Sequence, residues 1–268
     1  MLKRLKYYLR VYAEFLKLNV QSWAEYRVDF MIGIFAMFLT NVVTVAFFWV
    51  LFQQIPTLNG WTFDQLIFMF GFEVFTFGVW HAFLSGCTVW EMDRQVRQGD
   101  LDRNMLRPIN TLVLLVIRRL DDDGFGDFIA GVLLLAYSVP RIGVAWTAQN
   151  VAAMALFSAS SIVILFSINI LMAATSFWTT SGRSLSDLFW NTIRFVEYPI
   201  NIYNAALVWI LTYVVPFGFI SFYPAQYFFG NGQWLVYAYA TPFVAVISFV
   251  IAYAVWSHGL KNYASAGH

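Results

Sequence analysis

Long apolar runs constrain the fold of this chain more than any other feature of its sequence. An α-helix crosses the ~30 Å hydrocarbon core of a bilayer in about 20 residues, and several runs here reach that length. Inside the core every backbone polar group needs an internal partner, so the expected fold is an all-α integral membrane protein. The composition agrees, because 60% of residues are hydrophobic and only 12% are charged, far from the balance of soluble domains.

We expect one membrane domain, residues 28–268, with six transmembrane helices. The expected spans are residues 28–53, 65–86, 125–146, 148–178, 202–219 and 234–256. The third span requires Arg141 to reach the interface by snorkelling, and residues 112–123 before it are expected to form an interfacial elbow. Residues 181–201 are expected to be a polar connection between the fourth and fifth spans.

A broken apolar segment lies between the fifth and sixth spans. Residues 216–232 are too apolar for an open loop, while Pro216 and Pro224 interrupt any continuous crossing. A helical hairpin that dips into the outer leaflet fits this pattern, provided that protein covers its free backbone groups.

The first 27 residues are expected to form an amphipathic helix. Apolar residues recur every three or four positions and form one stripe, namely Leu2, Leu5, Leu9, Tyr12, Leu16, Val20 and Trp23. The basic residues lie on the other faces of this helix. This pattern is typical of a helix that lies in the membrane surface. The alternative is a helix packed on a soluble partner.

The placement of basic residues predicts the orientation. Of the 16 Lys and Arg residues, Arg141 alone falls on one side of the expected topology. Because basic residues gather on the cytoplasmic side, both termini are expected to be cytoplasmic in a multi-pass protein.

Residues 90–110 form a charged interruption between the second and third spans. Residues 90–97 are expected to be a short helix that Gly99 ends, since glycine adopts the left-handed conformation at least cost. Residues 100–107 are then expected to return as an extended segment, because Pro108 disfavours a helical Arg107. We interpret the stretch as a docking surface, the alternative being a solvated loop. Its expected docking residues are Trp90, Glu91, Met92, Asp93, Arg94, Gln95, Arg97, Gly99, Asp100 and Arg107.

Known catalytic and nucleotide-binding patterns are absent from the sequence. No lysine follows a glycine, which excludes a G-x-x-x-x-G-K-[ST] phosphate loop. There is no H-E-x-x-H or C-x-x-C motif, and the single Cys87 is expected to be a small buried hydrophobe. We therefore expect no catalytic residue, no metal, no cofactor bound by this chain and no nucleic-acid partner, with energy supplied by a separate protein.

Ionisable groups within the second span are candidates for a translocation path, because burying them in hydrocarbon costs several kcal/mol. Glu73 and His81 could line the path or relay protons. Alternatively they are structural and hydrogen-bond to polar side chains of neighbouring helices such as Asn41 or Asn169. The run Asp121, Asp122 and Asp123 could bind a metal, but a solvated elbow is the favoured interpretation.

Taken together, these features resemble the permease subunits of type-2 ATP-binding-cassette (ABC) exporters. The likeness covers the whole chain, and individual motifs resemble a poorly characterised bacterial branch of that family. These motifs are residues 98–102 (QGDLD), 106–108 (LRP), 222–225 (FYPA) and 259–267 (GLKNYASAG).

The resemblance implies a bacterial inner-membrane complex. Two permeases, identical or homologous, are expected to form the path and to sit on two ABC ATPase subunits that bind ATP and Mg. Residues 90–97 would then be the coupling helix, with the N-terminal helix against it. The competing hypotheses are an ion-coupled carrier or channel that uses Glu73 and His81, and an intramembrane enzyme, for which no residue constellation is found.

Overall fold

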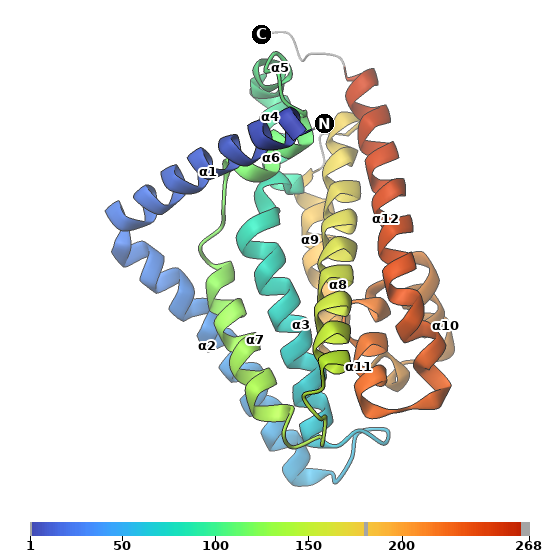
Figure 1. Cartoon of the computed structure of the whole chain (residues 1–268). Helices are drawn as coiled ribbons and strands as arrows, with labels where there is room; N and C mark the ends of the chain where they lie inside the picture. The colour runs from blue at the N-terminus through green and yellow to red at the C-terminus, as the bar shows by residue number, and fades with distance from the viewer. Residues whose placement is uncertain (1, 180–181, 264–268) are drawn as a thin grey trace.

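The computed structural model describes residues 2–179 and 182–263, and all regular elements in these two ranges are helices (Figure 1). Four of the described helices are long and apolar enough to cross a membrane. They are α2 (Arg27–Gln54), α3 (Phe63–Leu84), α8 (Ala148–Ala174) and α12 (Leu235–Asn262). At 1.5 Å per residue, the 28 residues of α2 extend over about 42 Å. The first, second, fourth and sixth expected spans each coincide with one of these helices.

Helix α3 lies at the centre and packs most closely against α7 (Gly124–Ser138). Glycines on both helices make this approach possible. A Cβ atom at Gly78 would meet the backbone of Phe128, and one at Gly131 would meet the backbone of Phe75. The two helices therefore touch backbone to backbone, as small residues allow in membrane proteins.

The predicted third span was too long. α7 contains 15 residues and ends at Ser138, so it extends over about 22 Å. Arg141 lies beyond the helix end, exposed, with its guanidinium 3.7 Å from the centre of the Tyr137 ring. Because the helix ends before Arg141, no snorkelling from within a span is needed.

Helix α1 (Leu2–Glu25) lies across one end of the bundle (Figure 1). The helices α4 (Val89–Arg97), α5 (Asp100–Met105) and α6 (Thr111–Arg118) lie at the same end. A break at Tyr26 separates α1 from α2. Asn19 joins it to the segment predicted as an elbow, because its Oδ1 accepts a hydrogen bond from the Leu120 N–H and its Nδ2 donates to Arg118 O. The predicted amphipathic helix is thus present and is docked on α6.

The predicted fifth span was wrong in its bounds and its continuity. Residues 202–219 contain no single helix; the segments there and just before are η4 (Ile200–Ile202), α10 (Ala205–Trp209), the π-helix η5 (Ile210–Val214) and η6 (Phe217–Phe219). The preceding residues, expected to be a polar connection, instead form α9 (Gly182–Ile193) and η3 (Arg194–Glu197). Phe189 packs on Trp80 and Trp190 on Phe77, so α9 already runs beside α3.

The predicted hairpin region folds as short helices covered by protein. η6 is followed by α11 (Phe222–Phe229), which Gly230 ends in the left-handed conformation, and then by η7 (Gly232–Trp234). Ser161 of α8 donates a hydrogen bond to Phe219 O in this segment, and Ser221 of the segment donates to Val196 O of η3. The segment meets the requirement that irregular backbone at membrane depth be buried in protein.

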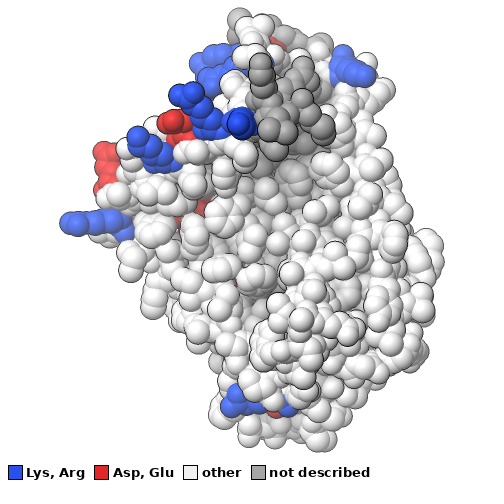
Figure 2. Space-filling model, in the orientation of Figure 1, with Lys and Arg blue, Asp and Glu red and all other residues white. Residues whose placement is uncertain are grey.

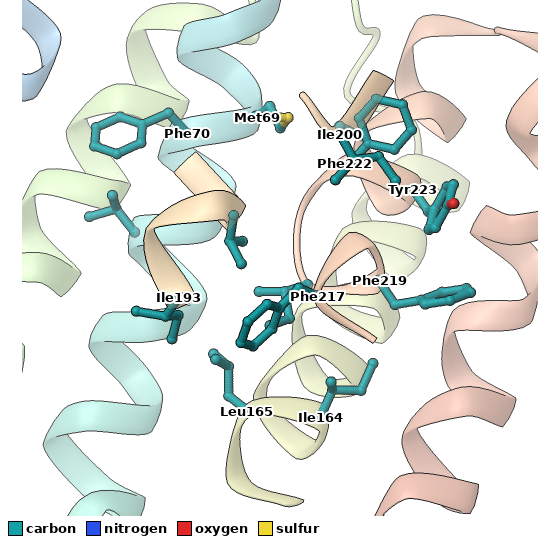
Figure 3. Packing of buried hydrophobic residues seen from close by; sticks show 14 of the residues in the cluster. Met69, Phe70, Ile164, Leu165, Ile193, Ile200, Phe217, Phe219, Phe222 and Tyr223 are labelled. Atoms are coloured by element: carbon teal, nitrogen blue, oxygen red, sulfur yellow. The ribbon is translucent and has the colours of Figure 1, made fainter. Parts of the chain in front are cut away.

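The main apolar core joins α3, α8, α9 and the hairpin region. Figure 3 shows its side chains converging from these elements, with Leu165 of α8, Ile193 of α9, and Phe217, Phe219 and Tyr223 of the hairpin region among them. The broken fifth segment therefore contributes to the core of the bundle and does not form a separate surface loop.

Charged residues gather at the two ends of the molecule. Figure 2 shows Lys, Arg, Asp and Glu over α1 and the adjoining end of the bundle, a few charges at the opposite end, and an uncharged zone between them on the visible face. This is the distribution expected when the middle zone lies in hydrocarbon.

Candidate functional site

The candidate docking element begins with α4 (Val89–Arg97), which agrees with the predicted short helix. Thr88 caps its N-terminus, its hydroxyl accepting from the Glu91 N–H at 3.3 Å. Two ion pairs run along its surface, Glu91–Arg94 at 2.7 Å and Asp93–Arg97 at 2.9 Å. Glu91 lies in the first turn and both arginines lie in the last turn, which is the charge order that the helix dipole favours.

The return of the chain is helical, so the predicted extended segment was wrong. Gly99 does end α4, with φ +69°, but Asp100–Met105 then form a second helix, α5. Pro108 restricts only Arg107, which lies beyond the end of α5, so its bias does not oppose this helix. Two features favour the helical return. Asp100 pairs with Arg103 at 2.8 Å within the helix, and Leu101 is completely buried. The ion pair is exposed and contributes little, so the burial of Leu101 is the larger effect.

One face of α4 is anchored in the membrane domain. Met92 is 0% exposed and Gln95 is 1% exposed. Met92 packs in an apolar cluster that includes Ala173 of α8 and Trp256 of α12. Gln95 donates to Glu91 and accepts from the amide of Asn104 at 2.8 Å, which ties α4 to α5. Of the predicted docking residues, Met92 and Gln95 therefore hold the helix in place and are not available for contact with a partner.

The opposite face of α4 is open. Trp90 is 47% exposed, and the Arg94 and Arg97 side chains are each 56% exposed. With Arg119 they help to line a groove of about 490 Å³ along the helix. The other predicted docking residues lie around this face, with Glu91, Asp93, Gly99 and Asp100 partly buried and Arg107 exposed.

Two exposed apolar side chains were missed in the sequence. Met105, the last residue of α5, is 42% exposed, and Leu106 directly after the helix is 87% exposed. In the sequence, Leu106 was recognised only as part of the LRP motif of residues 106–108. An apolar residue in a strongly charged stretch was the available signal, because large exposed apolar groups mark interaction sites.

Glu73 and His81 both lie on α3. Among the described residues, neither of them forms a hydrogen bond with Asn41 or Asn169, the partners that a structural role predicted. Glu73 is 8% exposed, and among the described residues no hydrogen bond to its carboxylate is found. His81 lies near the α4 end of α3, where its Nδ1 is 3.6 Å from Asp127 and its Nε2 is 3.8 Å from Asp121.

Asn41 and Asn169 form hydrogen bonds with residues other than the predicted Glu73 and His81. Asn41 of α2 donates to Asp127 of α7 at 2.7 Å, and Asn169 of α8 donates to the carbonyl of Cys87 at 2.8 Å. Cys87 is fully buried, as expected. Sequence reasoning missed Asp127, which sits at the start of an apolar helix and connects Asn41 with His81 across three helices.

A small cavity connects His81 with the docking helix. It measures about 200 Å³ and is lined among others by Trp80 and His81 of α3, Trp90 and Glu91 of α4, and Asp121. His81 is thus adjacent to α4, whereas Glu73 lies about two helical turns away from His81 along α3 and farther from α4.

The acidic run lies beside this cavity. One carboxylate oxygen from each of Asp121, Asp122 and Asp123 lies within 4.8 Å of the others. Partial burial and the neighbouring carboxylates of Asp121 and Asp122 raise the pKa of Asp123. Burial is the larger cause of this raised pKa, and repulsion from the two neighbouring carboxylates adds to it.

Fold and site together define a polytopic α-helical membrane protein with a folded, charged helical element at one end of its bundle. The family follows from direct comparison: the model of the ABC-2 family transporter proteins matches residues 38–267. The chain belongs to this family and is a transport subunit of the permease type. No curated protein and no solved structure matches it.

Proposed function

We propose that this chain is the permease subunit of an ATP-driven exporter in the bacterial inner membrane. It would couple to a separate ATPase, which binds ATP and Mg, through α4 and α5. The observation that carries this proposal is the two-sided construction of α4. Its buried face is fixed to α8 and α12, while Trp90, Arg94 and Arg97 face outward.

The exposed chemistry suits a specific protein partner. Trp90 and Leu106 are large side chains of the kind that fill pockets at the centre of interfaces. The arginines around them offer charged contacts that set orientation and association rate. The expected partner surface is an apolar pocket bordered by carboxylates.

The family and the position of α1 at the α4 end of the bundle support the rest of the proposed complex. A second permease, identical or homologous, would complete the path, and α1 would lie against the ATPase beside α4. Both α1 and the last turn of α12 lie at the α4 end (Figure 1). Coupling at that end therefore agrees with the proposal that both termini are cytoplasmic.

Co-purification with the partner tests this function. Trp90→Ala with Leu106→Ala is expected to remove the ATPase from the purified complex, because both side chains are exposed at the proposed docking face. The unfolding temperature of the permease is measured alongside to verify that the double variant is folded. Glu91→Arg with Arg94→Glu is the charge-reversal counterpart. Trp209→Ala, an exposed tryptophan far from α4, is the matched control. Retention of the ATPase by the Trp90/Leu106 double variant would overturn the docking proposal.

An ion-coupled carrier is the second candidate, and the polar set around His81 is the observation in its favour. Its distinguishing result is transport by the chain alone in vesicles, driven by a proton gradient and lost in Glu73→Gln and His81→Gln. Transport that instead requires ATP and a second protein would exclude this candidate.

A further inference from the structure

A second cavity lies at the end of the molecule opposite the docking element. Its volume is about 390 Å³, within the range of about 300–1,000 Å³ for small-molecule sites. It lies where α3 begins, whereas α4 follows the end of α3. Three separate stretches form it: the loop before α3, residue Asn201, and the end of α11 with the residues that follow.

The lining is rich in amides and aromatic rings and contains no charged side chain. Its members are Asn59, Gly60, Trp61, Gln65, Asn201, Gln226, Phe229, Asn231 and Trp234. Carboxamides both donate and accept hydrogen bonds. A lining of this kind suits a neutral ligand with many hydroxyl groups and gives no counter-charge to an ionic one.

The cavity wall is built in place. Trp61 is 6% exposed, stands between Phe222 and Phe229, and donates its Nε1 hydrogen to Asn201 Oδ1 at 3.1 Å. Asn59 donates to the Asn201 carbonyl at 2.7 Å. These contacts join the loop before α3 to the fifth segment and fix the amides around the opening.

Gln226 points to a ligand. This residue is 2% exposed and lines the cavity, yet no hydrogen bond to its side-chain amide is found among the described residues. The amide lines the cavity, so it can both donate to and accept from a polar group that enters there. A ligand hydroxyl pair in the cavity would supply both missing hydrogen bonds.

Trp234 supplies the aromatic surface. It is only partly buried and packs against Tyr223 and Tyr237 on its inner side, at centroid distances of 5.9 Å and 5.8 Å. The C–H groups of a sugar ring carry the partial positive charge that an aromatic face attracts. Amides and an accessible indole on one cavity are the chemistry that recognises a saccharide.

We propose that this cavity, centred on Gln226 and Trp234, binds a neutral saccharide at the end of the permease away from α4. The proposal goes beyond ATPase coupling and does not depend on it. Binding is measured on the permease alone, so failure here and failure of coupling give separate results.

The test is calorimetric titration of the full chain in nanodiscs with maltose and cellobiose. Glucuronate and triglycine serve as charged and peptide comparators. Gln226→Leu and Trp234→Ala are expected to weaken saccharide binding by about tenfold or more, the effect of losing about 1.4 kcal/mol. Gln54→Leu and Trp209→Ala, which lie outside the cavity, are expected to leave it unchanged.

Stability distinguishes a binding role from a structural one. The side-chain amide of Gln226 holds no described part of the chain by a hydrogen bond, so Gln226→Leu is expected to keep the unfolding temperature while binding is lost. The proposal is overturned if neither saccharide binds, if triglycine or glucuronate binds in their place, if the two variants bind normally, or if Gln226→Leu lowers the unfolding temperature.

Discussion

Asp127 is the residue through which three helices share polar contacts. It accepts a hydrogen bond from Asn41 of α2 and lies 3.6 Å from His81 of α3. An isolated buried carboxylate is costly, and a hydrogen-bonded one beside a cationic or polar group is tolerated. Because Asp127 is buried and hydrogen-bonded, the acidic residues at the start of α7 are not all exposed to solvent, as a solvated loop would require.

The titration of Asp123 gives a prediction at the same scale. Its pKa is raised by partial burial and by Asp121, Asp122 and Asp127, and lowered by His81. The folded state therefore binds a proton more tightly than the unfolded state, so stability is highest below the ordinary Asp pKa and falls as pH rises through the raised value. Asp123→Asn is expected to remove this decline, as measured by thermal unfolding between acid and neutral pH.

The exposed Asp29 provides the control for that experiment. Asp29→Asn is expected to retain the pH dependence of the parent chain, because this side chain lies on the open surface of α2. An Asp123→Asn protein whose stability falls as steeply as that of the parent chain over this pH range would contradict the assignment, because any decline that remains then has to come from other partly buried carboxyl groups such as Glu197.

At the scale of elements, the α3–α7 contact depends on glycine. A Cβ at Gly131 would meet both the backbone and the side chain of Phe75. Overpacking of this kind costs about 1–3 kcal/mol, so Gly131→Val is expected to lower the unfolding temperature in nanodiscs. Gly232→Ala is the matched control, because nothing lies within 4 Å of a Cβ there. Equal stability of the two variants would show that the helices can separate without cost.

The elements that sequence predicted well are those set by length and hydropathy alone. α2, α8 and α12 are long apolar runs, and nothing except a membrane-spanning helix accommodates them. α4 was predicted correctly because its end is set by a local feature, the left-handed conformation of Gly99. α5 was missed because the burial of Leu101 is a tertiary effect, and because the bias of Pro108, which acts on Arg107 alone, was extended to the residues before it.

The fifth segment was missed for a related reason. Its polar residues, Arg194 and Glu197 among them, indicated an exposed connection, but Val196 and Ile200 beside them belong to the main core. The cavity around Gln226 was equally hidden, since its lining comes from stretches more than a hundred residues apart. Amide side chains carry no periodicity that a single sequence reveals.

At the scale of the whole molecule, α1 is attached to the bundle by few contacts. Asn19 supplies hydrogen bonds to Arg118 O and Leu120 N–H. Asn19→Leu is expected to lower the free energy of opening of α1 by about 1–3 kcal/mol and to speed hydrogen exchange there, while α3 and α8 keep their protection. Gln21→Leu, exposed on the same helix, is the control. Unchanged exchange in α1 would show that the membrane surface alone holds it.

The close contact of α3 with α7 has a mechanical consequence. Only residues 85–88 separate α3 from α4, and α4 is itself pinned to α8. Glycine contacts leave no flexible side-chain layer between α3 and α7, so this part of the bundle has very low compliance. Any displacement of α4 would therefore be expected to move α3 and α7 together, and the far end of α3 carries Gln65, which lines the same cavity as Gln226.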